Sequence, residues 1–149
     1  MGSPFEKGRP TIWDENTNRI SELPKSCGAY RIVDRVSGSS ADYIGITGNI
    51  YNRIANHRSS TEWYSKDIHI VHVQTCMPCS STWKELREWE VNKIKQHDPK
   101  FNKYKGGNGR EPDKLWYNGE VIEIGHNESI SDLAESIGFL RRVLDILPF

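Results

Sequence analysis

The chain has 149 residues, a length that fits one domain with a buried core and a short extension. Its 20 basic and 20 acidic residues give a formal net charge of zero, which excludes a chain drawn to nucleic acid by its overall positive field. No apolar run is long enough to span a bilayer and the first residues carry no signal-peptide pattern, so we expect no membrane-spanning segment.

The first half of the chain predicts a hairpin and a helix. Residues 1–26 are polar and rich in turn formers, which predicts an irregular lead-in. Gly28–Val33 and Asp42–Ile46 have the composition of two strands joined by a serine-rich turn. Asn49 then offers a capping side chain for a helix over Ile50–Arg58.

The second half predicts a third strand and further helices. Ile68–Thr75 alternates as a strand does, and an apolar stripe predicts a helix over Thr82–Gln96. A hairpin is expected around Asn118-Gly119, followed by short helices over Ser131–Ile137 and Leu140–Leu147. Together these elements predict an α+β fold with three principal strands.

The three cysteines are an odd number and do not suggest a disulfide framework. Cys76 and Cys79 have the spacing of half a zinc site, with His69 and His72 just upstream. A second ligand pair at a clean spacing is absent from the sequence. We therefore prefer a loop with two reduced thiols, and a zinc-dependent binding module stays as an alternative.

Charge is unevenly distributed along the chain. Residues 93–110 hold six cations and one acid, a local charge of +5, whereas residues 111–149 hold three cations and eight acids, a local charge of −5. The basic segment also carries aromatic residues, so it predicts a surface that faces phosphates, the alternative being a solvated face. The expected nucleic-acid-binding residues are Lys93, Lys100, Lys103, Lys105 and Arg110.

Two helical positions predict a chemical site. Glu90 lies four residues after Leu86 and four before Ile94, so its carboxylate projects from the apolar stripe and needs a metal or a cation as compensation. The alternative for Glu90 is a buried ion pair with an arginine. Arg53 and His57 are spaced i, i+4 on the preceding helix and combine a phosphate-binding fork with a group that exchanges protons near neutral pH.

These residues belong to a pattern of four linked segments that covers about residues 28–104. The segments are Gly28-Ala29-Tyr30, Tyr43-Ile44-Gly45, the Arg53 and His57 pair, and Glu90 followed by Pro99, Phe101 and Asn102. In this pattern the chain resembles the GIY-YIG nuclease superfamily. The resemblance implies a small three-stranded antiparallel sheet flanked by helices, which agrees with the elements expected from the sequence itself.

The resemblance also implies a mechanism with Mg²⁺ (or Mn²⁺) as the cofactor. Glu90 would bind the ion, Arg53 would clamp the scissile phosphate, and Tyr30 would orient or deprotonate the attacking water with help from His57. Tyr43 would hold a neighbouring hydrogen bond, and Asn102 would fix the geometry of the site by hydrogen bonds, the hairpin being one candidate partner.

The sequence departs from the family pattern at two positions. Ala29 stands where isoleucine is usual, a change of core size that leaves Tyr30 in place. Ile46 stands where many members carry lysine. If that lysine helps activate the water in relatives, His57 must carry more of the proton transfer here.

We expect three regions: a lead-in over residues 1–26, a catalytic domain over 27–110, and an acidic C-terminal hairpin-plus-helices extension over 111–149 packed on it. Residues 129–142 resemble the first two helices of a helix-turn-helix. Their region is acidic, however, which is unfavourable for docking on phosphates, so we prefer a structural cap.

The sequence therefore predicts a divalent-metal-dependent endonuclease that hydrolyses DNA. The alternative is a non-catalytic nucleic-acid-binding or adaptor module on the same fold. Met1-Gly2-Ser3 resembles an expression remnant, so we expect a domain cut from something longer. The settings considered are a secreted interbacterial toxin with an immunity protein as partner, a restriction enzyme and a mobile-element nuclease. The expected location is the cytoplasm, either of the producing cell or of a target cell.

Overall fold

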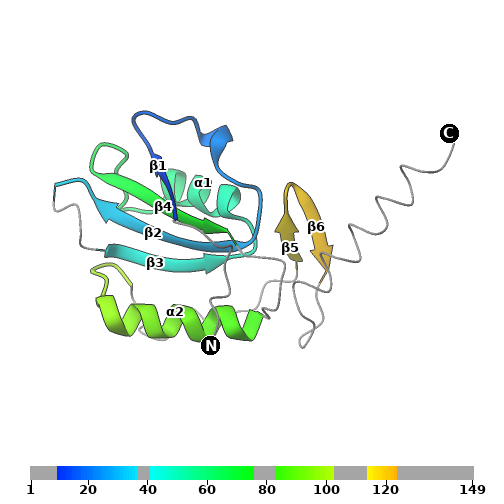
Figure 1. The fold of residues 1–149 in the computed structure, drawn as a ribbon. Helices are drawn as coiled ribbons and strands as arrows, with labels where there is room; N and C mark the ends of the chain where they lie inside the picture. The colour runs from blue at the N-terminus through cyan, green and yellow to red at the C-terminus, as the bar shows by residue number, and fades with distance from the viewer. Residues whose placement is uncertain (1–9, 37–40, 76–82, 103–113, 124–149) are drawn as a thin grey trace, which may run out of the picture.

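The computed structural model describes residues 10–36, 41–75, 83–102 and 114–123. Strands β1 to β4 form one antiparallel sheet in the order β1-β4-β2-β3, and β5 pairs with β6 (Figure 1). The elements are β1 (Thr11–Asp14), the 3-10 helix η1 (Ile20–Glu22), β2 (Gly28–Asp34), β3 (Ala41–Thr47), α1 (Ile50–Ser60), β4 (His69–Thr75), α2 (Trp83–His97), β5 (Lys114–Tyr117) and β6 (Glu120–Glu123).

The predicted α+β class is confirmed, but the prediction of a three-stranded sheet is wrong, because the sheet has four strands. The additional strand, β1, comes from the stretch that we expected to be irregular, and it pairs antiparallel with β4. Only Trp13 among its four residues is buried, and the indole Nε1 donates to the carbonyl of Arg19 at 2.8 Å. One inward aromatic residue is too short a pattern to reveal a strand in the sequence.

The other predicted elements that fall within the described residues start and end within one or two residues of the observed ones. Asn49 caps α1 as expected, because its side chain accepts a hydrogen bond from the backbone N–H of Asn52 at 3.1 Å. Helix α2 runs alongside the edge strand β3, whereas α1 lies behind the sheet in Figure 1. The two helices therefore cover different parts of the sheet.

Alternation along β2 divides the core into two parts. Tyr30 and Ile32 point to one face and pack in a cluster with Ile50 and Ile54 of α1. Ala29 points to the other face, where it shares a cluster with Leu86 of α2. The central strand β2 therefore has an apolar cluster on each of its faces.

The predicted hairpin at Asn118-Gly119 is confirmed. Both turn residues have positive φ, 48° and 84°, as a tight two-residue turn between strands requires. The N–H of Cys27 donates to the carbonyl of Trp116 at 2.7 Å, and the Trp116 N–H donates to the carbonyl of Gly48 at 2.9 Å. The hairpin is thus bonded to the start of β2 and to the turn before α1. The two helices predicted after it lie outside the described residues.

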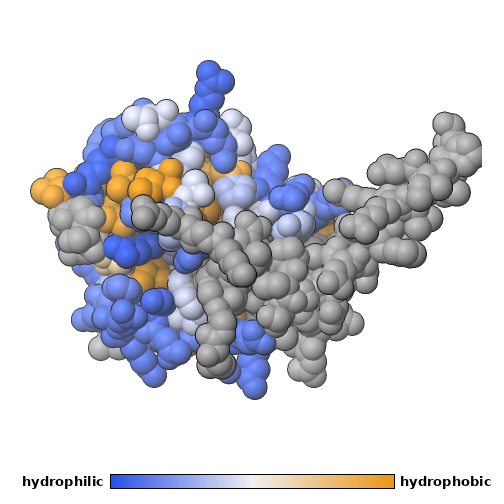
Figure 2. Space-filling model, in the orientation of Figure 1, coloured by the Kyte–Doolittle hydropathy of each residue, from blue (hydrophilic) through white to orange (hydrophobic). Residues whose placement is uncertain are grey.

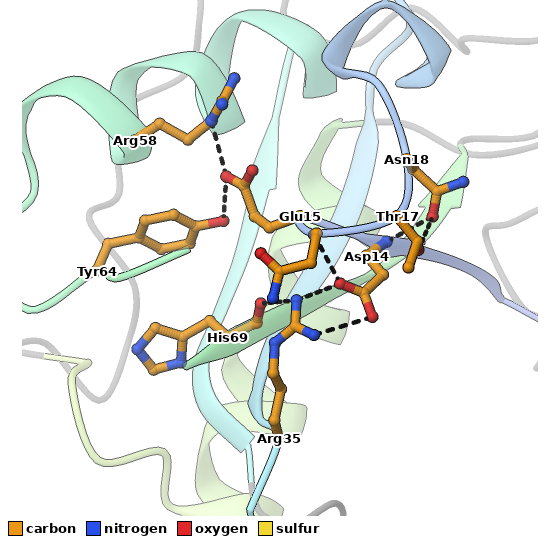
Figure 3. A network of polar contacts seen from close by, with 9 residues as sticks. Asp14, Glu15, Thr17, Asn18, Arg35, Arg58, Tyr64 and His69 are labelled. Atoms are coloured by element: carbon orange, nitrogen blue, oxygen red, sulfur yellow. Dashed lines mark hydrogen bonds and ion pairs between the residues drawn. The ribbon is translucent and has the colours of Figure 1, made fainter. Parts of the chain in front are cut away.

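A polar network fixes α1 against the segment that follows β1 (Figure 3). The buried carboxylate of Glu15 accepts from Nε of Arg58 on α1 at 2.8 Å and from the phenol of Tyr64, also at 2.8 Å. The guanidinium of Arg35 pairs with Asp14 beside it. Because Arg58 and Glu15 are joined, the helix that carries Arg53 and His57 is held from its C-terminal end.

The outward side of α2 is hydrophilic, whereas the apolar surface of the face drawn in Figure 2 gathers over the sheet. Within the described ranges, no helix combines the length and the apolar character needed to cross a bilayer. The large apolar side chains that are exposed in these ranges are Ile12, Val36, Ile68 and Val121.

Candidate active site

Tyr30 is held at the centre of β2, with its ring across the neighbouring strand. Its partner in the β2–β3 register is Gly45. A Cβ atom at position 45 would lie 2.6 Å from Oη and 2.7 Å from Cζ of Tyr30, far inside van der Waals contact. Glycine at this position therefore gives the tyrosine ring its place over β3.

A chain of hydrogen bonds joins Tyr30 to α1. Nε of Arg53 donates to Oη of Tyr30 at 3.2 Å, and the same Oη lies 2.9 Å from Nε2 of His57. Nδ1 of His57 lies 3.0 Å from Oγ1 of Thr61. Arg53, His57 and Thr61 follow one another at intervals of four residues, so they lie along one face of α1 and its C-terminal end.

The directions of these bonds follow from the donors available. A guanidinium only donates, so the Tyr30 oxygen accepts from Arg53, and two hydrogen-bond partners are within reach of its own proton, Nε2 of His57 and the side chain of Tyr43. A neutral imidazole that accepts at Nε2 donates at Nδ1, which matches the hydroxyl of Thr61 as acceptor. The hydrogen bonds therefore form one continuous series from Arg53 through Tyr30 and His57 to Thr61.

Burial and charge set the protonation states along this path. Burial, with the positive Arg53 as the lesser cause, lowers the pKa of His57 to about 4, so the imidazole is neutral at pH 7. Burial also raises the pKa of the Tyr30 phenol well above its usual value, although the charge of Arg53 acts in the opposite direction. The resting state is a protonated phenol that donates to a neutral imidazole.

Tyr43 is the more accessible phenol. Its ring centroid is 5.9 Å from that of Tyr30 and 5.1 Å from that of His57. Tyr43 is half-buried, whereas Tyr30 is 2% exposed. Interaction with Tyr30 first, and with Tyr43 as well, raises the pKa of Arg53 above its usual value, so the guanidinium faces both phenols.

Glu90 reaches the same stretch of β3 from α2. Its carboxylate is buried, and Oε2 accepts a hydrogen bond from the N–H of Ile46 at 3.1 Å. Ile46 directly follows Gly45, against which the Tyr30 hydroxyl packs, so the two oxygens lie at most about 10 Å apart. The charge of Arg87 on the same helix also acts on Glu90, so the alternative of a pair with an arginine stays open.

The interactions around Glu90 only partly offset the cost of burying its carboxylate. Burial raises its pKa, and the Ile46 N–H and the charge of Arg87 only partly oppose this. A hard divalent cation fits such a group, because Mg²⁺ in proteins is held by one or two carboxylates and keeps several waters. Among the described residues no group of three His, Cys, Asp or Glu side chains forms a metal cluster.

Asn102 forms two hydrogen bonds with the backbone at the free edge of β3. Its amide oxygen accepts from the N–H of Ile44 at 3.0 Å, and its amide nitrogen donates to the carbonyl of the same residue at 2.9 Å. The N–H of Phe101 donates to the carbonyl of Asp42 at 2.8 Å. The segment after α2 thus pairs with the sheet edge in place of a fifth strand, and the predicted bonds between Asn102 and the hairpin are present.

Two features of this site were not predicted from the sequence. Thr61 is the second partner of His57, and its spacing of four residues from that histidine is the signal that would have found it. Trp63 stacks on Phe101 with centroids 4.5 Å apart and lies 5.5 Å from Tyr43. The loop that follows α1 carries no regular pattern that would have placed this ring.

The predicted basic surface is described only in part. Lys93 is half-buried on α2, and its ammonium lies 3.4 Å from the side-chain oxygen of Gln96. The Lys100 ammonium lies 5.1 Å from the Phe101 ring centroid. The other three cations predicted for this surface, and the two cysteines considered for zinc, lie outside the described residues.

A scan against protein-family models and a search of curated proteins found no match to this chain.

Proposed function

We propose that this chain is a divalent-metal-dependent endonuclease that hydrolyses DNA phosphodiester bonds by a one-metal mechanism of the GIY-YIG type. The observation that carries the proposal is the bonded series Arg53–Tyr30–His57, with the carboxylate of Glu90 fixed on the adjoining residue of β3. An arginine, two phenols, an imidazole and a carboxylate are the groups that attack on a phosphodiester requires.

The proton path runs inward from Tyr43. Because Tyr43 is half-buried and Tyr30 is almost fully buried, the attacking water meets Tyr43 first. The proton of Tyr30 first moves to Nε2 of His57, which is neutral at pH 7, and the charge of Arg53 stabilises the Tyr30 phenolate that forms. That phenolate then takes the proton of the hydroxyl of Tyr43, which in turn takes the proton of the attacking water and leaves hydroxide as the nucleophile.

The same guanidinium holds the phosphate. Nε of Arg53 is engaged by Tyr30, and a guanidinium has four further N–H donors suited to the oxygens of a pentacovalent phosphorus. Glu90 would hold the divalent ion, most simply Mg²⁺ or Mn²⁺, which when bound stabilises charge on the leaving 3′ oxygen. Asn102 keeps β3, and with it Gly45 and the ring of Tyr30, in position.

One observation favours a second function, a non-catalytic nucleic-acid-binding module on the same fold. Tyr30 is only 2% exposed, so it does not itself offer an oxygen to solvent. In such a module the series of hydrogen bonds would serve stability alone.

Incubation with supercoiled plasmid separates the two functions. The endonuclease proposal expects nicked and linear products with Mg²⁺ or Mn²⁺ and none with EDTA. Retarded migration of the plasmid without cleavage in either metal would support the binding module.

The biological setting is a further proposal with the same chemistry in each case. A secreted toxin would have a longer secreted parent and a small neighbouring immunity gene, which a restriction enzyme or a mobile-element nuclease would lack. Examination of the neighbouring open reading frames distinguishes these settings, and with them delivery into a target cell from action in the producing cell.

A further inference from the structure

Four aromatic rings form a stacked series that begins at the candidate active site. The ring centroid of Tyr43 lies 5.9 Å from that of Tyr30 at an interplanar angle of 20°, and 5.5 Å from that of Trp63 at 30°. The indole of Trp63 in turn stacks on Phe101, with centroids 4.5 Å apart and an interplanar angle of 4°. Each ring is therefore nearly parallel to the next, and the aromatic series leads from Tyr30 to Phe101.

Three separate parts of the chain contribute the outer rings of this series. Tyr43 lies on β3, Trp63 in the loop after α1, and Phe101 in the segment after α2. The N–H of Phe101 donates at 2.8 Å to the carbonyl of Asp42, the residue that directly precedes Tyr43. Tertiary contacts therefore hold the outer rings beside one another at the edge of the sheet.

The outer rings keep part of their surface in contact with solvent. Tyr30 and Tyr64 belong to the apolar cluster beside α1 and are buried. Tyr43 and Trp63 pack against the same cluster but are only half-buried, as is Phe101. Rings that served packing alone would gain free energy from the complete burial that their neighbours have. The series therefore presents aromatic surface at which a further planar ring can stack.

A cation lies at each end of the aromatic series. The Lys100 ammonium lies 5.1 Å from the ring centroid of Phe101, and because Trp63 covers one face of that ring, the ammonium lies over the other. Lys100 is exposed, and its flexible stem allows the ammonium to leave the ring for a phosphate. At the inner end, Nε of Arg53 donates to the hydroxyl of Tyr30. Proteins bind single-stranded nucleic acid with this combination of aromatic rings for bases and cations for phosphates.

We propose that the aromatic series binds unpaired nucleobases, so that the substrate class of this site is DNA with single-stranded character beside the cleaved bond. This substrate preference rests on the proposed endonuclease function, because it takes Arg53 as the group that holds the scissile phosphate. A base stacks on the exposed part of the outer rings, and a neighbouring phosphate reaches Lys100.

Duplex DNA fits such a surface less well. The faces of its bases are covered by their neighbours in the helix, so the rings reach them only after local opening of the duplex. Negative supercoiling favours that opening, and a supercoiled plasmid therefore remains a substrate.

Three probes of about 12 nucleotides test the preference: a fluorescent oligothymidine, the same strand with abasic sites in place of its bases, and the duplex of the oligothymidine with its complement. Binding to the full chain is measured by fluorescence anisotropy in EDTA, at one salt concentration because the affinity depends on salt. We expect the oligothymidine to bind at least about tenfold more tightly than either of the other probes. Equal affinity for the oligothymidine and the abasic strand would overturn the proposal, since the two differ only in their bases.

Variants assign the surface. Trp63→Leu should weaken oligothymidine binding at least about tenfold and leave binding of the abasic strand unchanged, and Phe101→Leu gives an independent test if the first variant folds poorly. Tyr51→Leu is the matched control. The Tyr51 ring is half-buried against the same cluster as Trp63 and has the ammonium of Lys25 5.2 Å from its centroid, but it lies outside the aromatic series. Equal losses of affinity in Trp63→Leu and Tyr51→Leu would overturn the proposal.

The binding test is separate from the test of cleavage, because EDTA removes the metal. Base-dependent binding through Trp63 by a protein that nicks no plasmid would support the nucleobase-binding surface and contradict the endonuclease. Metal-dependent nicking by a protein that binds the oligothymidine and the abasic strand equally would support the endonuclease and overturn the nucleobase-binding surface.

Discussion

The hydroxyl of Tyr30 lies 2.9 Å from Nε2 of His57, and both side chains are buried. The imidazole has a pKa of about 4, so at pH 7 it is uncharged and can accept a hydrogen bond from the phenol. This relationship couples a strand residue to a helix residue 27 positions later in the chain. It has consequences for stability as well as for the proposed catalysis.

The buried imidazole should make the fold sensitive to acid. The folded pKa of His57 is about 4 and its ordinary value is 6.5, so the unfolded chain binds the proton more readily between these pH values. Stability is therefore unaffected by this group above about pH 6.5, and falls by up to about 3 kcal/mol as pH drops to about 4. Urea unfolding of the wild type and of His57→Gln across this range measures the difference.

Comparison with His57→Gln removes the contributions of other groups. Glu90 has a raised pKa, so its effect on stability has the opposite sign, but it is present in both proteins. The variant should lose less stability on acidification than the wild type does. Equal losses in the two proteins would show that folding does not lower the pKa of His57.

Gly45→Ala should destabilise the fold by about 1–3 kcal/mol, because the new methyl group would overlap the buried ring of Tyr30. The ring has to move away from β3, which also disturbs its bond to His57. Thermal unfolding gives the stability, and the NMR shift of the His57 ring reports the displacement. An alanine variant with wild-type stability and an unchanged His57 signal would contradict the packing described.

Asn102→Ala should cost about 1–3 kcal/mol, because it leaves both backbone groups of Ile44 at the sheet edge without the amide. Asn102→Asp should not restore stability, since a carboxylate can accept from the Ile44 N–H but cannot donate to its carbonyl. Asn92→Ala is the control, an exposed asparagine on α2. If chemical unfolding gives Asn102→Asp the same free energy of unfolding as the wild type, the hydrogen bond donated by the Asn102 amide does not stabilise the sheet edge.

Arg53→Lys should reduce cleavage by about 10²–10³-fold while the protein stays folded. An ammonium keeps the charge but loses the planar fork that engages Tyr30 and, in the proposed mechanism, the phosphate. Arg58→Lys makes the same change five residues later on α1, where the partner is the carboxylate of Glu15. Single-turnover rates that fall equally in both variants would mean that Arg53 acts only through the stability of the helix.

The fold was predictable where the elements are long or carry capping residues. Helix α2 showed its apolar stripe, and Asn49 marked the start of α1. Strand β1 was not predictable, because its contribution to the core is one residue, Trp13, and its pairing with β4 joins positions about 60 residues apart. Such a short strand is stabilised by its partner rather than by its own sequence.

The sequence indicated which residues to consider for the site more readily than it indicated their contacts. Spacing placed Arg53 and His57 on one helical face, and the hairpin was one candidate partner for the hydrogen bonds of Asn102. The almost complete burial of Tyr30 was not, since it depends on the cluster around β2 and on the rings that pack beside it. Burial of this kind arises from tertiary packing, which local periodicity does not contain.

The carboxylate of Glu90 gives the most direct test of the endonuclease account. Glu90→Gln keeps an acceptor for the Ile46 N–H, so the free energy of unfolding should stay within about 1 kcal/mol of the wild type. Glu88→Gln removes an exposed charge from the same helix and serves as the matched control. Plasmid nicking at increasing Mg²⁺ concentrations is the measurement. The account predicts that the wild type and Glu88→Gln cleave the plasmid and that the nicking rate of Glu90→Gln is at least about 10²-fold lower. Nicking by Glu90→Gln at the wild-type rate, or undiminished nicking by the wild type in EDTA, would contradict it.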